Sequence, residues 1–206
     1  MAEISAQLVK QLREITGAGM MECKSALTEA KGDLKEAEVV LRKRGIASAG
    51  KKSSRATKQG MVGFYIHPGS QLGVMVEVNC ESDFVARTED FQELVKDIAM
   101  HVAAADPQFI RREDVTADAI GKEKDIQKAR ALAEGKPEKV VDKIIEGRMG
   151  KFYEEICLLE QPFVKEPTMK IEDLIKSKIA KLGENITVAR FVRYKVGDSA
   201  AAEAAE

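Results

Sequence analysis

The period of the hydrophobic pattern changes along this chain, and the change limits the possible fold more than any other feature. Between residues 5 and 41, apolar side chains recur every three or four positions, as in amphipathic helices. Two runs rich in β-branched and aromatic residues follow at 61–67 and 72–79, and Pro68 to Gln71 supply turn residues between them. The helical period returns at Phe91. This separation of helices from strands predicts an α+β fold.

The first 45 residues read as three short helices. Ser5 is a candidate N-cap for a helix that ends at Thr16, because Gly17-Ala18-Gly19 interrupts the pattern. A second apolar face begins at Met20, and Asp33 opens a third helix that we expect to end at Gly45, with residues 46–58 as a possible extension of it. Together they predict a small helical domain.

The rest of the chain predicts a mixed core. We expect a helix from Phe91 to Asp106, two antiparallel helices between Thr116 and Met149, a helix through Ile171 and Ile179, and a strand from Ile186 to Val196. The antiparallel strands should pack with helices and a helical hairpin. The predicted organisation is a three-helix domain at 1–45, a basic linker at 46–58, an α+β core at 59–197 and a disordered tail at 198–206.

The net charge of −1 conceals a strongly basic block. Residues 42–58 contain seven Lys and Arg and no acidic residue. Such a block can attract phosphates or an acidic protein surface, although it is more often a solvated linker. It supports an alternative function, a ribosome- or RNA-associated binding module, but it lacks the aromatic residues that single-stranded nucleic acid favours.

Other features limit where this protein can be located and which chemistry it can carry out. No run of apolar residues is long enough for a membrane span, and Met1 to Leu8 lack the apolar stretch of a secretory signal. Three widely spaced cysteines favour free thiols, so we expect a cytoplasmic protein. Two histidines and the absence of phosphate-loop, dinucleotide and nucleophile-elbow motifs argue against catalysis. We therefore expect no catalytic residue, no metal site and no cofactor.

Two groups of residues leave alternatives open. Ser82, Asp83, Phe84 and Val85 lie between a strand and a helix, where Ser82 or Asp83 could cap the helix while Phe84 packs into the core. Alternatively, the connection presents Phe84 and the Asp83 charge to a partner. The methionines at 20 and 21 present the same choice between filling the core and contacting a partner.

Three stretches of this chain resemble the bacterial elongation factor Ts family. They are Leu12 to Leu27 (LREITGAGMMECKSAL), Val76 to Arg87 (VEVNCESDFVAR), and Glu146 to Phe152 (EGRMGKF) with Gln161 to Phe163. Where the family usually has Thr, this chain has Ser82, which keeps the hydroxyl group.

The resemblance implies a ubiquitin-associated-like N-terminal domain and a function as guanine-nucleotide exchange factor for elongation factor Tu, acting by protein binding. It implies that Phe84 inserts into the nucleotide-binding domain of that partner, that Asp83 helps to displace the Mg²⁺ bound to GDP, and that Ser82 and Val85 frame them. Met20, Met21 and Lys24 would bind the same partner domain elsewhere.

The resemblance also bears on assembly. Longer members of the family carry two related halves in the core, whereas this chain has a single hairpin that leads directly to Phe91. This short form implies a homodimer and a complex of two exchange factors with two elongation factors Tu. No membrane partner and no direct nucleic-acid contact are expected.

Overall fold

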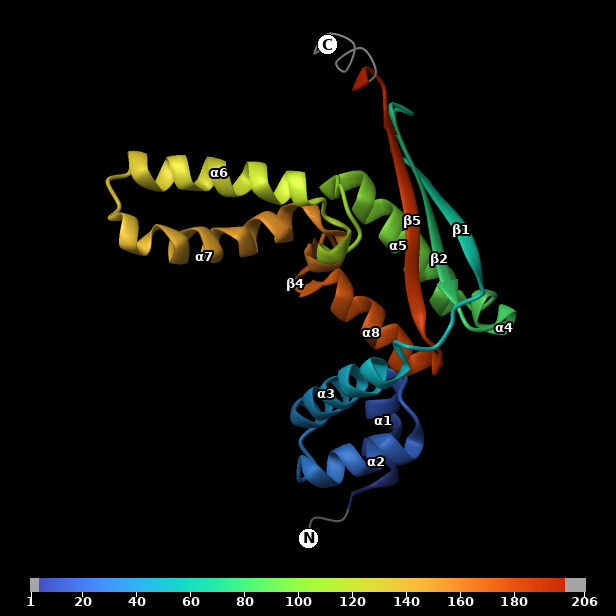
Figure 1. Cartoon of the computed structure of the whole chain (residues 1–206). Coiled ribbons are helices and arrows are strands. Elements are labelled where there is room, and N and C mark those ends of the chain that lie inside the picture. The colour runs from blue at the N-terminus through green and yellow to red at the C-terminus, as the bar shows by residue number, and fades with distance from the viewer. Residues whose placement is uncertain (1–3, 199–206) are drawn as a thin grey trace. The chain divides into compact units, whose positions relative to one another are not determined.

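The computed structural model describes residues 4–198, apart from the side chain of Glu138, and contains both helices and strands (Figure 1). The α-helices are α1 (Ala6–Thr16), α2 (Met20–Glu29), α3 (Leu34–Lys52), α4 (Asp83–Ala86), α5 (Glu89–Ala105), α6 (Ala117–Ala133), α7 (Glu138–Ile156) and α8 (Ile171–Leu182). The strands are β1 (Gln59–Ile66), β2 (Leu72–Cys80), β3 (Pro162–Phe163), β4 (Glu166–Lys170) and β5 (Ile186–Lys195), and two 3-10 helices are η1 (Arg112–Asp114) and η2 (Leu158–Glu160).

The α+β prediction is confirmed. The strands form a three-stranded sheet of order β1-β2-β5 and a small antiparallel sheet of β3 and β4. The predicted hairpin corresponds to β1 and β2, and the turn between them is closed by a hydrogen bond from His67 N–H to the Leu72 carbonyl oxygen (2.9 Å). The disordered tail predicted at 198–206 lies, from residue 199 onward, outside the described residues.

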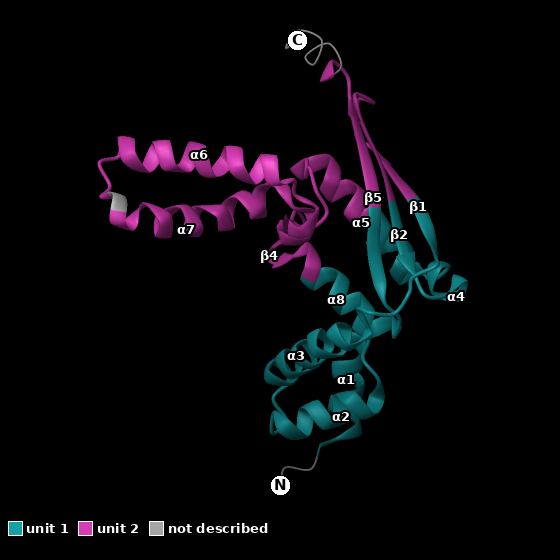
Figure 2. Ribbon diagram, in the orientation of Figure 1, with its two compact units in different colours: residues 1–62, 77–95, 173–189 teal, residues 63–76, 96–172, 190–206 magenta. Residues whose placement is uncertain are grey.

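The described chain forms two compact units (Figure 2). Within residues 4–198, the first unit contains the residues up to 62, 77–95 and 173–189, and the second contains 63–76, 96–172 and the residues from 190 onward. The sheet and α5 each contribute segments to both units.

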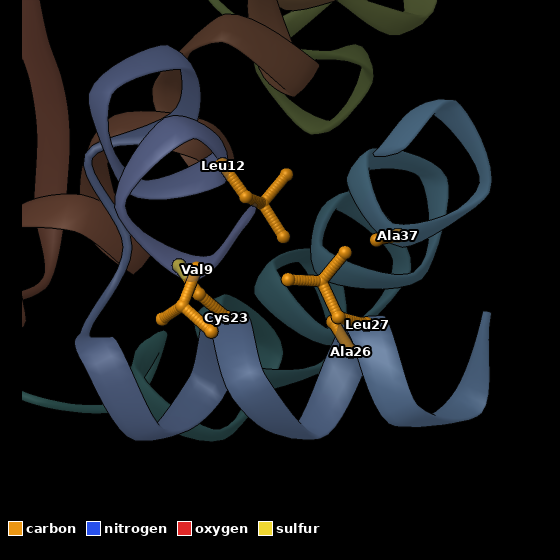
Figure 3. Packing of buried hydrophobic residues seen from close by; sticks show 6 residues of the cluster. All are labelled: Val9, Leu12, Cys23, Ala26, Leu27 and Ala37. Atoms are coloured by element: carbon orange, nitrogen blue, oxygen red, sulfur yellow. The ribbon is translucent and has the colours of Figure 1, made fainter. Parts of the chain in front are cut away.

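The first unit begins with the helices α1 to α3, which enclose a small apolar core (Figure 3). Ser5 caps α1 by accepting a hydrogen bond from Leu8 N–H, and Asp33 caps α3 by accepting one from Glu36 N–H, as predicted. The helices meet over six buried side chains: Val9, Leu12, Cys23, Ala26, Leu27 and Ala37.

The helix α3 follows the alternative in which the third helix extends beyond Gly45. It passes through Gly45 and ends at Lys52, so most of the predicted linker is helical. Glycine inside a helix costs about 1 kcal/mol relative to alanine, but here a Cβ atom at position 45 would come within 3.0 Å of the Ala180 Cβ. Gly45 therefore permits close packing between α3 and α8 and does not end the helix.

The second unit contains the predicted helical hairpin of α6 and α7, which lie side by side in Figure 1. Four side chains form the core of the hairpin, and a second cluster lies where α7 ends. The first set is Ala131, Val141, Ile145 and Met149, and the second is Val115, Ile156 and Cys157.

A buried polar network joins α5 to the end of α7 and to β3. His101 is fully buried, and its Nε2 lies 2.9 Å from Gln161 Oε1, while Val164 N–H donates to Nδ1. The Gln161 amide in turn donates to the carbonyl oxygens of Ala105 and Glu155. These contacts require a neutral ring with its proton on Nε2, and burial lowers the pKa of His101 below its ordinary value of 6.5.

This network predicts that acid weakens the fold. Because the folded-state pKa of His101 is depressed, the unfolded chain binds the extra proton first as the pH falls below 6.5. The stability that neutral His101 contributes is complete above pH 6.5 and is lost as the pH falls through its folded-state pKa. Urea unfolding at several pH values measures this loss. His101 should make the free energy of unfolding fall by at most about 1.4 kcal/mol for each pH unit.

The second histidine of the chain provides the matched control. His67 is exposed, so the free energy of unfolding of His67→Gln should depend on acid as it does in the wild type. The His101→Gln variant should lose part of this acid dependence, even if the variant is less stable than the wild type at every pH. An unchanged slope in His101→Gln would contradict the assignment.

Candidate functional site

The segment from Ser82 to Val85 forms the start of α4, a single helical turn between β2 and α5. The Ser82 hydroxyl accepts a hydrogen bond from Val85 N–H (3.4 Å), so Ser82 is the N-cap. At the other end, the Thr88 hydroxyl donates to the Val85 carbonyl oxygen (2.7 Å) and accepts from Phe91 N–H (3.3 Å). Side-chain hydrogen bonds therefore fix both ends of this turn.

The structure confirms one part of the first alternative and contradicts the other. Ser82 caps the helix, but the side chain of Phe84 is 79% exposed and does not pack into the core. The carboxylate of Asp83 is half-exposed and pairs with the Arg87 guanidinium (2.9 Å) one helical turn later. The sequence analysis missed Arg87, although its spacing of four residues from Asp83 is a recognisable signal.

A carboxylate from a distant part of the chain holds the start of α4. Glu184 Oε2 accepts hydrogen bonds from the backbone N–H groups of Glu81 (3.1 Å) and Ser82 (2.9 Å), and its Oε1 accepts one from the Ser82 hydroxyl (2.5 Å). Hydrogen bonds to a charged acceptor are about twice as strong as neutral ones. Glu184 therefore fixes the segment from which Phe84 projects.

In a second set of contacts, the donor and acceptor segments are exchanged. Glu81 Oε1 accepts a hydrogen bond from Asn185 N–H (2.6 Å) and lies 3.5 Å from Arg55 Nη1. The buried Asn185 amide donates to the carbonyl oxygens of Ser53 (3.3 Å) and Arg55 (2.8 Å). Three chain segments thus meet at this junction: the residues after α3, the β2–α4 connection, and the residues after α8.

Ion pairs place α8 beside the start of α5. Asp90 Oδ1 accepts from the ammonium groups of Lys178 (3.0 Å) and Lys181 (2.7 Å). The hydrogen bond from Lys181, followed by that from Lys178, holds the pKa of Asp90 below its usual value. Gly183, with φ 81°, then ends α8, and the next residue is Glu184, which binds the start of α4.

Cys80 lies beneath the same junction and is chemically unsuited to act as a nucleophile. Its side chain is buried, and its Sγ donates to the Ser82 carbonyl oxygen (3.1 Å). Burial raises the pKa of the thiol, and the nearby Glu184 carboxylate raises it further. All three cysteines are free and buried, as the sequence suggested for Cys80.

The second predicted group lies at the start of α2. Met20 is 59% exposed and Met21 77% exposed, so neither fills the core, and Lys24 is also exposed one turn later on the same helix. Glu22 fixes this end of α2 by accepting a hydrogen bond from Gly19 N–H (3.2 Å). Within residues 4–198, no hydrogen bond or ion pair joins these residues to the 82–85 segment.

A third surface, which the sequence analysis did not identify, lies on the sheet in the second unit. Apolar side chains from β1, β2 and the end of β5 line a shallow groove of about 580 Å³. We call this set the sheet groove; its exposed apolar members are Phe64, Ile66, Met75, Tyr194 and Val196. Exposed apolar patches that are contiguous mark interaction sites.

Residues 4–198 contain neither a membrane-spanning helix nor a cluster of metal ligands. None of the helices in this part of the chain is long and apolar enough to cross a membrane. No group of three or more His, Cys, Asp or Glu side chains in the same residues could hold a metal ion.

The exposure of Phe84 predicts how its removal affects stability. Phe84→Ala should change the free energy of unfolding by less than about 0.5 kcal/mol, because the ring contributes little to the core. Phe91→Ala is the matched control, since Phe91 is fully buried, and it should cost about 3–5 kcal/mol. Urea unfolding of both variants measures the difference, and similar losses would contradict the observed exposure.

Similarity to known proteins shows the family of this chain. A family model described as Elongation factor TS matches residues 2–198. The elongation factor Ts of Solibacter usitatus (strain Ellin6076) is 82% identical over 199 residues, which cover 97% of this chain and 94% of that protein. The elongation factors Ts of Koribacter versatilis (strain Ellin345) and Desulforamulus reducens are 62% and 58% identical, over 95% and 96% of this chain and 89% and 91% of their own lengths. The chain therefore belongs to the elongation factor Ts family of translation elongation factors.

Proposed function

We propose that this protein is the guanine-nucleotide exchange factor of elongation factor Tu. It binds elongation factor Tu carrying GDP, displaces Mg²⁺ and disturbs the phosphate site, so that GDP leaves and GTP can load. The observation that carries this proposal is the 79% exposure of Phe84 on a turn whose two ends are fixed by hydrogen bonds. Membership of the elongation factor Ts family supports the choice of partner.

Phe84 supplies binding energy to the nucleotide-free partner. Burying an exposed phenylalanine side chain is worth about 1.5–3 kcal/mol. Because about 1.4 kcal/mol corresponds to a factor of ten, insertion of the ring accounts for about a 10- to 100-fold preference for the partner conformation that accepts it. If only the nucleotide-free form accepts the ring, this preference appears as faster GDP release.

Asp83 supplies a negative charge near the partner's Mg²⁺ site. In the free protein its carboxylate is paired with Arg87. Both side chains are substantially exposed, and exposed ion pairs of this kind contribute at most about 1 kcal/mol, so release of Asp83 from Arg87 is inexpensive. Ser82 and Val85 frame these two residues by fixing the first turn of α4.

Met20, Met21 and Lys24 provide a second contact with the same partner. Two exposed, flexible thioether side chains suit a protein surface of irregular shape, and Lys24 adds a positive charge beside them. This contact supplies affinity that does not depend on nucleotide release.

We further propose that two copies of the chain pair through the sheet groove. The groove exposes apolar side chains that include Phe64, Ile66 and Tyr194, and pairing would remove this surface from water. The assembly would then contain two exchange factors and two elongation factors Tu.

The exchange proposal predicts that the wild-type protein accelerates release of fluorescent GDP from elongation factor Tu. Phe84→Ala should reduce this stimulation by about 10- to 100-fold, with Phe84→Leu intermediate because it keeps part of the apolar side chain. Val39→Ala, which shortens another exposed apolar side chain, should leave it unchanged. Unaltered GDP release in the presence of the wild-type protein would overturn the proposal.

The assembly proposal predicts a mass in solution of twice 22.6 kDa. Ile66→Lys places a charge in the sheet groove and should shift the mass measured by light scattering to that of one chain. Ile126→Lys is the matched control, because Ile126 on α6 is 58% exposed and Ile66 is 54% exposed. A wild-type monomer at micromolar concentration would contradict pairing.

A further inference from the structure

We propose that Glu184 is a positioning residue for nucleotide exchange, which holds Phe84 ready for insertion without touching the partner itself. This inference rests on the proposed exchange function and adds a residue that lies 102 positions from the Ser82 it binds.

The groups around Glu184 favour a carboxylate. Its Oε2 accepts from two backbone N–H groups, and its Oε1 accepts from the Ser82 hydroxyl. A glutamine amide has a single oxygen, so it could keep the two backbone N–H groups only if the Ser82 hydroxyl turned to accept from the amide N–H. It would also lose the negative charge that strengthens all three hydrogen bonds.

The segment that Glu184 holds is too short to be stable alone. The helix α4 contains four residues, and a single helical turn fixes several backbone angles for very few hydrogen bonds. Phe84 is exposed, so side-chain packing cannot order it either. The hydrogen bonds at Ser82 and Thr88 are therefore what keep this turn formed.

The position of Glu184 is itself fixed by its neighbours. Gly183 ends α8, and Asn185 is held by Glu81, Ser53 and Arg55. Glu184 is only partly exposed, and both of its oxygens are occupied. It can therefore influence exchange only through the segment that it holds, which is preorganised before the partner arrives.

A double-mutant cycle tests this dependence. Glu184→Gln should lower the maximal rate of GDP release by about 10-fold, because displacement of a positioned group by about 1 Å is costly. The same substitution in the Phe84→Ala background should lower it by less than about 2-fold, since no ring remains to be positioned. Equal fold-losses in the two backgrounds would overturn the inference.

The choice of variants separates positioning from a general loss of structure. Ser82→Ala removes the hydroxyl that bonds Glu184 and, with it, the cap of α4, so it should reproduce at least the loss seen in Glu184→Gln. If Glu184→Gln does not fold, Ser82→Ala replaces it in the cycle. Glu154→Gln removes another paired surface carboxylate and should have no effect.

Hydrogen exchange in the free protein gives a readout that does not involve the partner. The amides of Glu81 and Ser82 should be protected in the wild type and lose protection in Glu184→Ala, which removes the acceptor oxygens, while Val76 and Val78 in β2 remain protected. Unchanged protection at Glu81 and Ser82 would overturn the positioning role alone. Failure of the wild type to accelerate GDP release would instead overturn the proposed function and, with it, the role of Glu184 in exchange.

Discussion

The hydrogen bonds between the Glu184 carboxylate and the start of α4 are the contacts on which the rest of the site depends. They bring together parts of the chain that are more than 100 residues apart. An aromatic ring that must stay exposed cannot contribute to its own ordering by burial. Polar contacts beneath the ring have to supply that order, and here a charged acceptor with three donors does so.

The proposed interaction surfaces share this arrangement of exposed apolar groups on a firmly held backbone. Phe84 lies on a capped helical turn, and Met20 and Met21 begin a helix whose first turn is fixed by Glu22. The sheet groove places its side chains on paired strands. Such surfaces bind with a smaller loss of conformational entropy than a flexible segment would. They suit a protein that acts by binding one conformation of its partner more tightly than another.

Local signals in the sequence predicted much of the fold, and they failed where distant residues decide the outcome. Ser5 and Asp33 were identifiable as caps because capping depends on neighbouring residues. Gly45 was predicted to end a helix, but its role is set by Ala180, far along the chain. The residues alone left the orientation of Phe84 open, and nothing near Glu184 in the sequence indicates its hydrogen bonds to Ser82. Long-range contacts carry no periodicity, so pattern analysis does not detect them.

The dependence of exchange on Mg²⁺ tests the central claim most directly. The measurement is the ratio of GDP release rates from elongation factor Tu with and without this protein, at millimolar free Mg²⁺ and after chelation. If the 82–85 segment acts partly by displacing the ion, the ratio should fall when Mg²⁺ has already been removed, because chelation then supplies that part of the acceleration without the protein. The same ratio under both conditions would contradict displacement of Mg²⁺ as part of the mechanism.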